Sequence, residues 1–244
     1  MKRSLYSLAA VAAFIVVSLL SIVPAFAATV TGRLDLGAKN MYSSDSIGDV
    51  FYRDHLIPQG SLTVTHEPSG VYVQLWTSMS LDRGRNFGKE TDFTVGITRK
   101  VGGFVFGGGY SYWALVGVDL HDLFASVDFP SVLGATPYLC VDQALPTDAD
   151  VLEGGVLYKA GLKGTVDVAG QPFALDAHLG GHDGAFGKNP AHPAIGKVGV
   201  STTIGVIGNL SVTPSVAYQF PISGDCGNEV FYGANLSFPF DIVK

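Results

Sequence analysis

Apolar and polar residues alternate with a period of two along most of this chain, and this pattern constrains the fold more than any other feature. In the first such segment, Leu34 and Leu36 lie on one face of an extended chain. Arg33 and Asp35 lie on the opposite face. Strict alternation is typical of a β-strand with one apolar and one polar face. The pattern recurs in eleven further segments and predicts about twelve strands, with roughly eighteen residues for each strand and its connection.

The connections between the expected strands alternate between short and long. Short turns are expected near residues 67–69, 100–102, 129–134, 164–170 and 208–209. Longer polar loops are expected near residues 40–54, 81–90, 115–119, 145–150, 181–195 and 221–228. Short periplasmic turns and longer external loops are typical of outer-membrane barrels. An even number of strands then places both ends of the barrel on the periplasmic side.

The first 27 residues have the organisation of a secretory signal peptide. Lys2 and Arg3 precede an apolar run from Leu8 to Val23, and the Ala-Phe-Ala sequence at 25–27 resembles a cleavage site. The apolar run is shorter than the roughly 18 residues expected of a membrane-spanning helix, which favours a cleaved signal over an anchor. We therefore expect a signal peptide at residues 1–27 and one β-barrel domain at residues 28–244.

After residue 27, the sequence contains no apolar stretch long enough to cross a bilayer as a helix, so insertion would have to use strands. Because backbone groups must be paired inside a bilayer, a spanning sheet has to close on itself. The expected fold class is all-β, a closed antiparallel transmembrane β-barrel of about 12 strands in a Gram-negative outer membrane. Pro58 and Pro214 fall inside expected strands, where each removes one ladder hydrogen bond.

Composition narrows the classes of partner. The net charge of −6 becomes −8 once residues 1–27 are removed, because Lys2 and Arg3 are lost and no acidic residue is. This sign argues against nucleic acid as a partner. The 31 glycines and the charged fraction of 15% suit closely paired, two-faced strands.

Aromatic residues of the apolar phase gather near the ends of the expected strands. One set is expected at the periplasmic edge: Phe104, Phe129, Phe173, Phe238 and Phe240. The other is expected toward the outer edge: Phe93, Tyr110, Tyr112, Tyr218 and Tyr232. Two such girdles indicate contact with outer-membrane lipid at both interfaces. The final strand also resembles the signal that barrel-assembly machinery recognises, although four residues follow Phe240.

The polar phase supplies the candidate functional residues, which would line the lumen. They are Arg33, Asp35, Lys39, Asp92, Asp122, Asp128, Asp142, Lys159, Asp176 and Lys197. Their mixed sign with an acidic excess favours cations or neutral solutes in a pore. The alternative is that these charges pair with one another and close a narrow structural barrel, since side chains could nearly fill a barrel of about twelve strands.

A lipid hydrolase, a metal-binding protein and a protease are further alternatives to a channel. A lipid hydrolase would need a nucleophile, yet none of the six histidines has a serine two residues later. A metal site at His178, His182, Asp183 and His192 lacks the spacing of known zinc motifs. A protease dyad of His182 and Asp183 is disfavoured because adjacent residues on a strand point in opposite directions. We therefore expect no enzyme activity, no metal and no cofactor.

Two further features leave alternatives open. Arg83, Arg85 and Lys89 would lie in an external loop, where they could bind lipopolysaccharide phosphates or simply be solvated. Cys140 and Cys226 are exported to an oxidising compartment and are a candidate disulfide, with two unpaired thiols as the alternative.

Residues 30–115 resemble a family of conserved hypothetical proteobacterial proteins of the Gcw type. The resemblance rests on the following residues: Tyr52, Arg53, Pro58, Gln59, Gly60, His66, Ser69, Gly70, Tyr72, Trp76, Ser78, Glu90, Asp92, Gly96, Gly109, Tyr110 and Tyr112. It implies an uncharacterised outer-membrane β-barrel and adds no chemistry. From the sequence we expect a porin-like channel for small polar solutes, with a non-conducting structural or surface-interaction barrel as the alternative.

Overall fold

The computed structural model describes residues 29–43, 50–79, 89–115, 119–147, 153–183, 192–223 and 227–243. The expected signal peptide at residues 1–27 lies outside this part of the chain and remains a prediction. Within the described ranges, no helix has the length and apolar character needed to cross a membrane.

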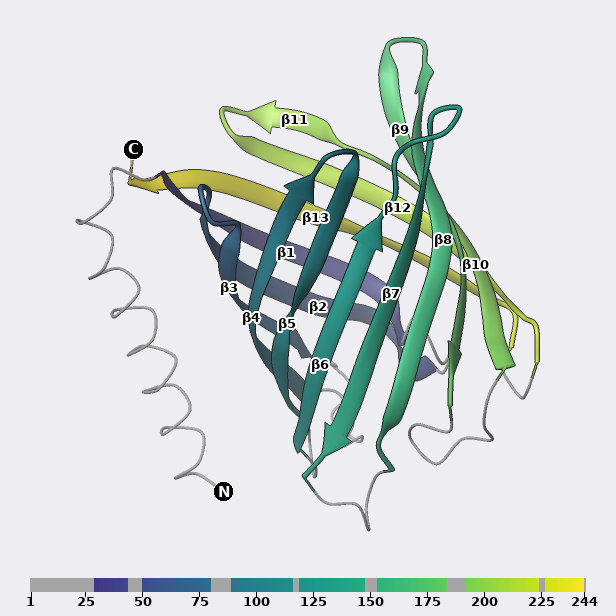
Figure 1. The fold of residues 1–244 in the computed structure, drawn as a ribbon. Helices are drawn as coiled ribbons and strands as arrows, with labels where there is room; N and C mark the ends of the chain where they lie inside the picture. Colours follow the sequence, from purple (N-terminus) through teal and green to yellow (C-terminus); the bar gives the residue numbers. More distant parts are fainter. Residues whose placement is uncertain are drawn as a thin grey trace.

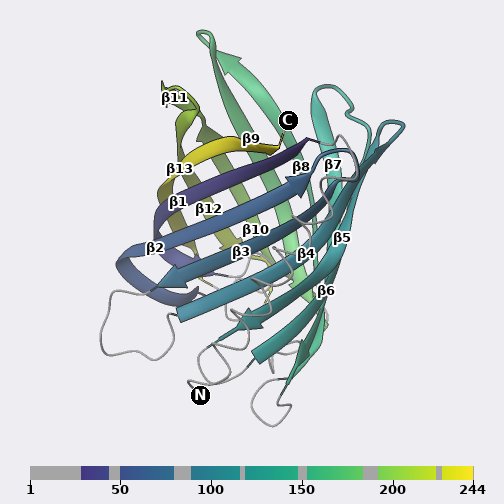
Figure 2. The ribbon, with the colours of Figure 1, turned by 90° about the vertical axis from the view of Figure 1, so that its left-hand side faces the viewer.

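The described residues form one sheet of antiparallel strands that closes into a barrel (Figure 1, Figure 2). The strands are β1 (Val30–Ser43), β2 (Val50–His66), β3 (Val71–Met79), β4 (Lys89–Val101), β5 (Phe104–Ala114), β6 (Asp119–Asp128), β7 (Ala135–Pro146), β8 (Gly155–Val168), β9 (Gln171–His182), β10 (His192–Thr202), β11 (Ile204–Ile207), β12 (Leu210–Pro221) and β13 (Glu229–Val243). Except for β10 and β11, which both pair with β12, each strand pairs with its neighbours in sequence, and the β1–β13 pairing joins the two ends of the described chain. The expected all-β closed barrel is confirmed.

Strands β10 and β11 together form one strand of a twelve-strand barrel. Both pair with β12, and the register runs without a shift from Ser201↔Ser215 in β10 to Ile204↔Val212 in β11. The interruption lies beside Pro214, which has no backbone N–H to donate to a ladder. The hydroxyls of Thr203 and Thr213 bridge the same place at 2.9 Å. The expected count of about twelve strands is therefore correct, and the proline accounts for the break.

The chain reverses after β2, β4, β6, β8 and β11 at one end of the barrel, which we call the turn end, and Val30 and Val243 pair at the same end. The other end, where β1, β3, β5, β7, β9 and β12 finish, is the loop end (Figure 1). The turn expected at 164–170 is much tighter, since β8 continues to Val168. Ala169 and Gly170 then reverse the chain with φ angles of 55° and 82°. Positive φ at both central residues is the geometry that suits the twist of paired strands.

The apolar phase of the strands faces outward. Leu36, Leu123 and Leu162 are each more than half exposed, as expected for side chains that would face lipid. The aromatic groups fall near both ends as the sequence predicts. At the turn end, Phe104 packs edge-on against Phe129 with ring centroids 5.9 Å apart.

Close contact between strands also depends on glycine. Gly32 lies under the ring of Phe240 on β13, and Gly196 lies under the ring of Phe220 on β12. A side chain at either glycine would collide with the ring. Aromatic side chains that cover glycines in this way help to fix the register of neighbouring strands.

Candidate functional site: the barrel lumen

The strand register identifies the face that lines the lumen. Directly paired residues on neighbouring strands point to the same side of a sheet. Asp35 pairs with Ser61, Ser61 with Trp76, and Trp76 with Asp92, so these residues share the face opposite the exposed leucines. The same alternation places all of the candidates predicted from the sequence on this inner face: Arg33, Asp35, Lys39, Asp92, Asp122, Asp128, Asp142, Lys159, Asp176 and Lys197.

Register also adds lumen residues that the sequence analysis did not select. They include Glu90, Lys100, Lys163, His178, His182 and Glu229. His178 alternates with Ala177 and Leu179, so its inward position could be predicted from the sequence, whereas Glu90 lies between Lys89 and Thr91 and has no such signal. In the sequence, His178 and His182 are candidate metal ligands, and His182 is also half of a possible protease dyad.

Asp35 is held by hydrogen bonds from three strands. Its carboxylate pairs with Arg33 Nε at 2.8 Å and accepts bonds from Ser61 Oγ at 3.3 Å and Asn235 Nδ2 at 3.2 Å. The hydroxyl of Ser237 donates a further bond. Because Ser61 is on β2 and Asn235 is on β13, this network joins both sides of β1 at the seam where the barrel closes. Asp35 therefore acts as a structural brace.

Asp176 is the centre of a second network, on the wall formed by β7, β8 and β9. Its two carboxylate oxygens accept bonds from Tyr138 Oη at 2.8 Å and from His178 Nδ1 at 2.6 Å. On the same wall, Lys163 Nζ bonds both oxygens of Asp128, at 2.7 and 2.8 Å. The ammonium group of Lys163 also lies 5.4 Å from the centroid of the Tyr138 ring.

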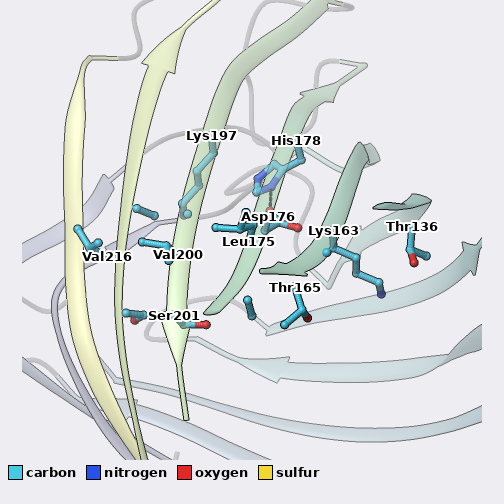
Figure 3. Close-up of a pocket in the computed structure, with 15 residues that line it drawn as sticks. Thr136, Lys163, Thr165, Leu175, Asp176, His178, Lys197, Val200, Ser201 and Val216 are labelled. Atoms are coloured by element: carbon cyan, nitrogen blue, oxygen red, sulfur yellow. Dashed lines mark hydrogen bonds and ion pairs between the residues drawn. The ribbon is translucent and has the colours of Figure 1, made fainter. Parts of the chain in front are cut away.

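This second network borders a hollow of about 570 Å³ in the lumen. Figure 3 shows Lys163 from β8, His178 from β9 and Lys197 from β10 around it. Lys197 Nζ lies 4.2 Å from the centroid of the Phe231 ring. A smaller hollow of about 250 Å³ lies against β1, β2, β3 and β13 and is bordered by Asp35, Gln59 and Trp76. The lumen therefore has polar space on two sides.

A third group of acidic residues has a different environment. We call Glu90, Asp92, Asp122 and Asp142 the acidic wall; they lie on β4, β6 and β7, toward the loop end. Glu90 and Asp122 are buried, with 6% and 3% of their surface exposed. The Oδ1 atoms of Asp92 and Asp122 are buried and have no hydrogen-bond partner among the described residues. In contrast to Asp35 and Asp176, these two Oδ1 atoms keep capacity to accept a hydrogen bond.

Exposure also changes along the barrel axis. Ser78, Leu120 and Gln219, near the loop end, are fully buried. The side chains of Arg33 and Lys163, nearer the turn end, remain 56% and 46% exposed. The lumen is thus more tightly packed toward the loop end and more open toward the turn end.

The alternative site chemistries find little geometric support in the described part of the chain. No group of three histidine, cysteine, aspartate or glutamate side chains has a metal-binding arrangement there. Asp183 Oδ1 accepts a bond from the backbone N–H of Val156 at 2.7 Å, which uses it at the start of β8. His192 begins β10, and its side chain lies outside the described residues.

Two predictions from the sequence depend on residues that are not described. Cys140 is a free, half-buried cysteine, whereas Cys226 lies outside the described residues, so the disulfide stays a prediction. Arg83 and Arg85 are also outside that part, as is the side chain of Lys89, and lipopolysaccharide binding by this loop stays a prediction.

Comparison with known proteins supports the architecture through structure and not through sequence. No family model matches the chain, and no curated protein matches it by sequence. The resemblance of residues 30–115 to the Gcw-type family therefore remains an expectation.

Several solved structures share the fold. A KdgM porin matches with a TM-score of 0.56 and 8% identity, over 85% of this chain and 99% of that chain. A NanC porin matches with a TM-score of 0.54 and 10% identity, over 84% and 98%. An outer-membrane channel from Pseudomonas putida F1 matches with a TM-score of 0.51 and 13% identity, over 87% and 96%. The chain therefore has the closed twelve-strand fold of outer-membrane, porin-like channels.

Proposed function

We propose that this protein is an outer-membrane channel for the passive passage of small polar solutes. The observation that carries the proposal is a closed barrel whose outer face is apolar and whose inner face is charged and hollow. An apolar exterior suits lipid, and a polar interior suits water and solutes. In the proposed orientation the short turns face the periplasm and the longer loops face the exterior.

The structural neighbours support a channel at the level of fold. A KdgM porin has been solved in complex with disordered oligogalacturonate, so a barrel of this shape can hold a polar solute. The described inner face of this barrel carries acidic residues on β4, β6 and β7, and a mixed set of lysine, histidine and aspartate on β8, β9 and β10. The acidic side chains on the described inner face outnumber the lysines and arginines, which favours cationic or neutral solutes.

A non-conducting barrel is the alternative, and one observation favours it. The complete burial of Ser78, Leu120 and Gln219 is what a barrel closed by its own side chains would display near the loop end. Such a protein would act as a structural element or as a surface-interaction platform. An enzyme is disfavoured, because the matched barrels named above are channels and the inner face presents no activated nucleophile among the described residues.

Conductance in planar lipid bilayers separates these proposals. The purified protein is first tested by heat-dependent gel mobility, since a closed barrel migrates differently before and after heating. We expect discrete current steps that scale with salt concentration and that change when Asp92 is replaced in Asp92→Asn. A heat-modifiable barrel that stays electrically silent would support the structural alternative. Turnover of phospholipid or peptide by the same preparation would support an enzyme.

A further inference from the structure

The chain contains two tryptophans, and both flank the same lumen carboxylate. Asp92 on β4 pairs directly with Trp76 on β3 and with Trp113 on β5. Because directly paired residues share a face, the two indole rings lie on either side of Asp92 on the inner wall. All three side chains are half-buried, so each keeps some exposed surface.

The surroundings of this trio are strongly acidic. Glu90 is two residues from Asp92 on the same face of β4, and the two carboxyl groups interact. Asp122 on β6 is close enough to act electrostatically on Asp92. Among the described lumen-facing residues of β3 to β7, Lys100 is the one lysine or arginine, and it lies near the turn end, far along β4 from Asp92.

Two carboxyl oxygens at this place lack a donor. Asp92 Oδ1 and Asp122 Oδ1 are buried without a partner among the described residues, and Asp122 is 97% buried, with 3% of its surface exposed. A buried acceptor without a donor costs free energy, and a bound donor would recover it. Since the acceptors are acidic, the group that fits them is a cationic donor.

The aromatic rings indicate which kind of cation fits. Tryptophan offers the most favourable aromatic face for an ammonium group, through cation–π attraction. A bare metal ion would instead need a cage of oxygen ligands, and the described residues hold no such arrangement. Trp76 also borders the hollow of about 250 Å³. Gln59 Nε2, a buried amide nitrogen beside this hollow, lacks a partner and could bind a polar substituent of the solute.

We propose that Trp76, Asp92 and Trp113, supported by Glu90 and Asp122, form a binding site for a small organic cation that carries an ammonium group. The site lies toward the loop end, so it would select solutes on the outer side of the channel. This inference rests on the proposed function, because a selective site of this kind serves a channel. Its chemistry concerns binding alone and can be measured without current.

Intrinsic fluorescence gives a direct test, because every tryptophan signal of this protein comes from the proposed site. Choline chloride is titrated into the purified barrel at constant ionic strength, with glucose and potassium sulfate as comparison solutes. We expect saturable quenching or a spectral shift with choline, and no saturable change with glucose or potassium. The variant Trp113→Phe keeps an aromatic ring and assigns the remaining signal to Trp76.

Two acidic variants and one control test the chemistry. Asp92→Asn and Asp122→Asn should each weaken choline binding about tenfold, because each removes a carboxyl group from the acidic surroundings of the ammonium group. Asp176→Asn removes a carboxyl group on β9, away from the two tryptophans, and should leave the affinity within about twofold. Heat-dependent gel mobility establishes that each variant is a closed barrel.

Three results would overturn the inference. In the first, choline produces no saturable signal. In the second, Asp92→Asn and Asp122→Asn leave choline binding unchanged. In the third, glucose binds at the same place independently of Asp92. The last result would indicate a carbohydrate site. The fluorescence assay needs no current, so the two proposals can fail separately. Normal conductance without choline binding would contradict the site and support the channel. Choline binding without conductance would support the site in a non-conducting barrel.

Discussion

The two walls of the lumen use the same acidic side chains in opposite ways. We use the name braced wall for three carboxylates on separate strands, Asp35 on β1, Asp128 on β6 and Asp176 on β9, and each of them bonds to a partner from its own or another strand. On the acidic wall, Asp92 and Asp122 are partly or fully buried and retain an unpartnered oxygen among the described residues. A carboxylate that bonds to several strands contributes to the barrel, whereas a carboxyl group with an unpartnered oxygen keeps capacity to accept a bond from a solute.

This difference explains why charge alone does not identify a functional residue. Asp35 and Asp92 belong to the same inner face and are both acidic. They differ in what the neighbouring strands place beside them: hydroxyl, amide and guanidinium donors around Asp35, and two indole rings and a second carboxyl group around Asp92. Substitutions on the two walls should therefore change the free energy of unfolding by different amounts.

The largest expected effect is the loss of the Asp35 brace. Asp35→Ala leaves the donors of Arg33, Asn235 and Ser237 without their acceptor and should lower the free energy of unfolding by about 3 kcal/mol. Urea unfolding in lipid vesicles, followed by tryptophan fluorescence, provides the measurement. Asp92→Ala is the matched variant and should cost far less. Equal losses in the two variants would mean that the walls do not differ.

A smaller loss is expected for Tyr138→Phe. The hydroxyl of Tyr138 donates to Asp176 at 2.8 Å, and its removal should cost about 1 kcal/mol because His178 still bonds the same carboxylate. The same unfolding assay measures it. Stability equal to that of the unmodified protein would remove this bond from the brace.

The Lys163–Asp128 ion pair should contribute still less to the free energy of unfolding. Both side chains are partly exposed to the lumen, at 46% and 28%, so water and salt screen their attraction. Lys163→Met should cost less than about 1 kcal/mol, and high salt should reduce the difference further. A loss that persists in high salt would show that the pair is stronger than an exposed pair.

The smallest effect is expected on the acidic wall itself. Asp122→Asn keeps the shape of the side chain and replaces a buried ionisable group by a neutral amide, so the free energy of unfolding should stay within about 1 kcal/mol of the unmodified value or rise. A large loss would show that Asp122 is a structural brace and would remove it from the proposed solute site.

Much of the architecture could be predicted from the sequence because it depends on local alternation. The outward placement of Leu34 and the inward placement of Asp35 follow from a period of two. The lengths of the connections predict which ends of the strands meet. Pro58 and Pro214 were both expected to weaken their strands, but β2 and β12 run through them, and the interruption lies in the partner of β12, between β10 and β11.

The division into two walls was not predictable, because it depends on register. Trp76, Asp92 and Trp113 lie on three consecutive strands, and a slip of one residue in β3 or in β5 would turn the indole ring of that strand away from the lumen. The brace at Asp35 similarly requires β13 to return beside β1, which brings Ser237 to a residue about 200 positions earlier. The sequence pattern predicts which face of its strand a side chain occupies, whereas its neighbours on other strands depend on the register of the closed barrel.

The reversal potential of single channels across a gradient of potassium chloride tests the central claim most directly. We predict a current with a preference for cations, and a cation-to-anion permeability ratio that falls about threefold or more in the double variant Asp92→Asn/Asp122→Asn. The control variant Asp176→Asn should change the ratio far less. A heat-modifiable barrel without current, a preference for anions, or a ratio that the double variant leaves unchanged would contradict a conducting lumen governed by its acidic wall.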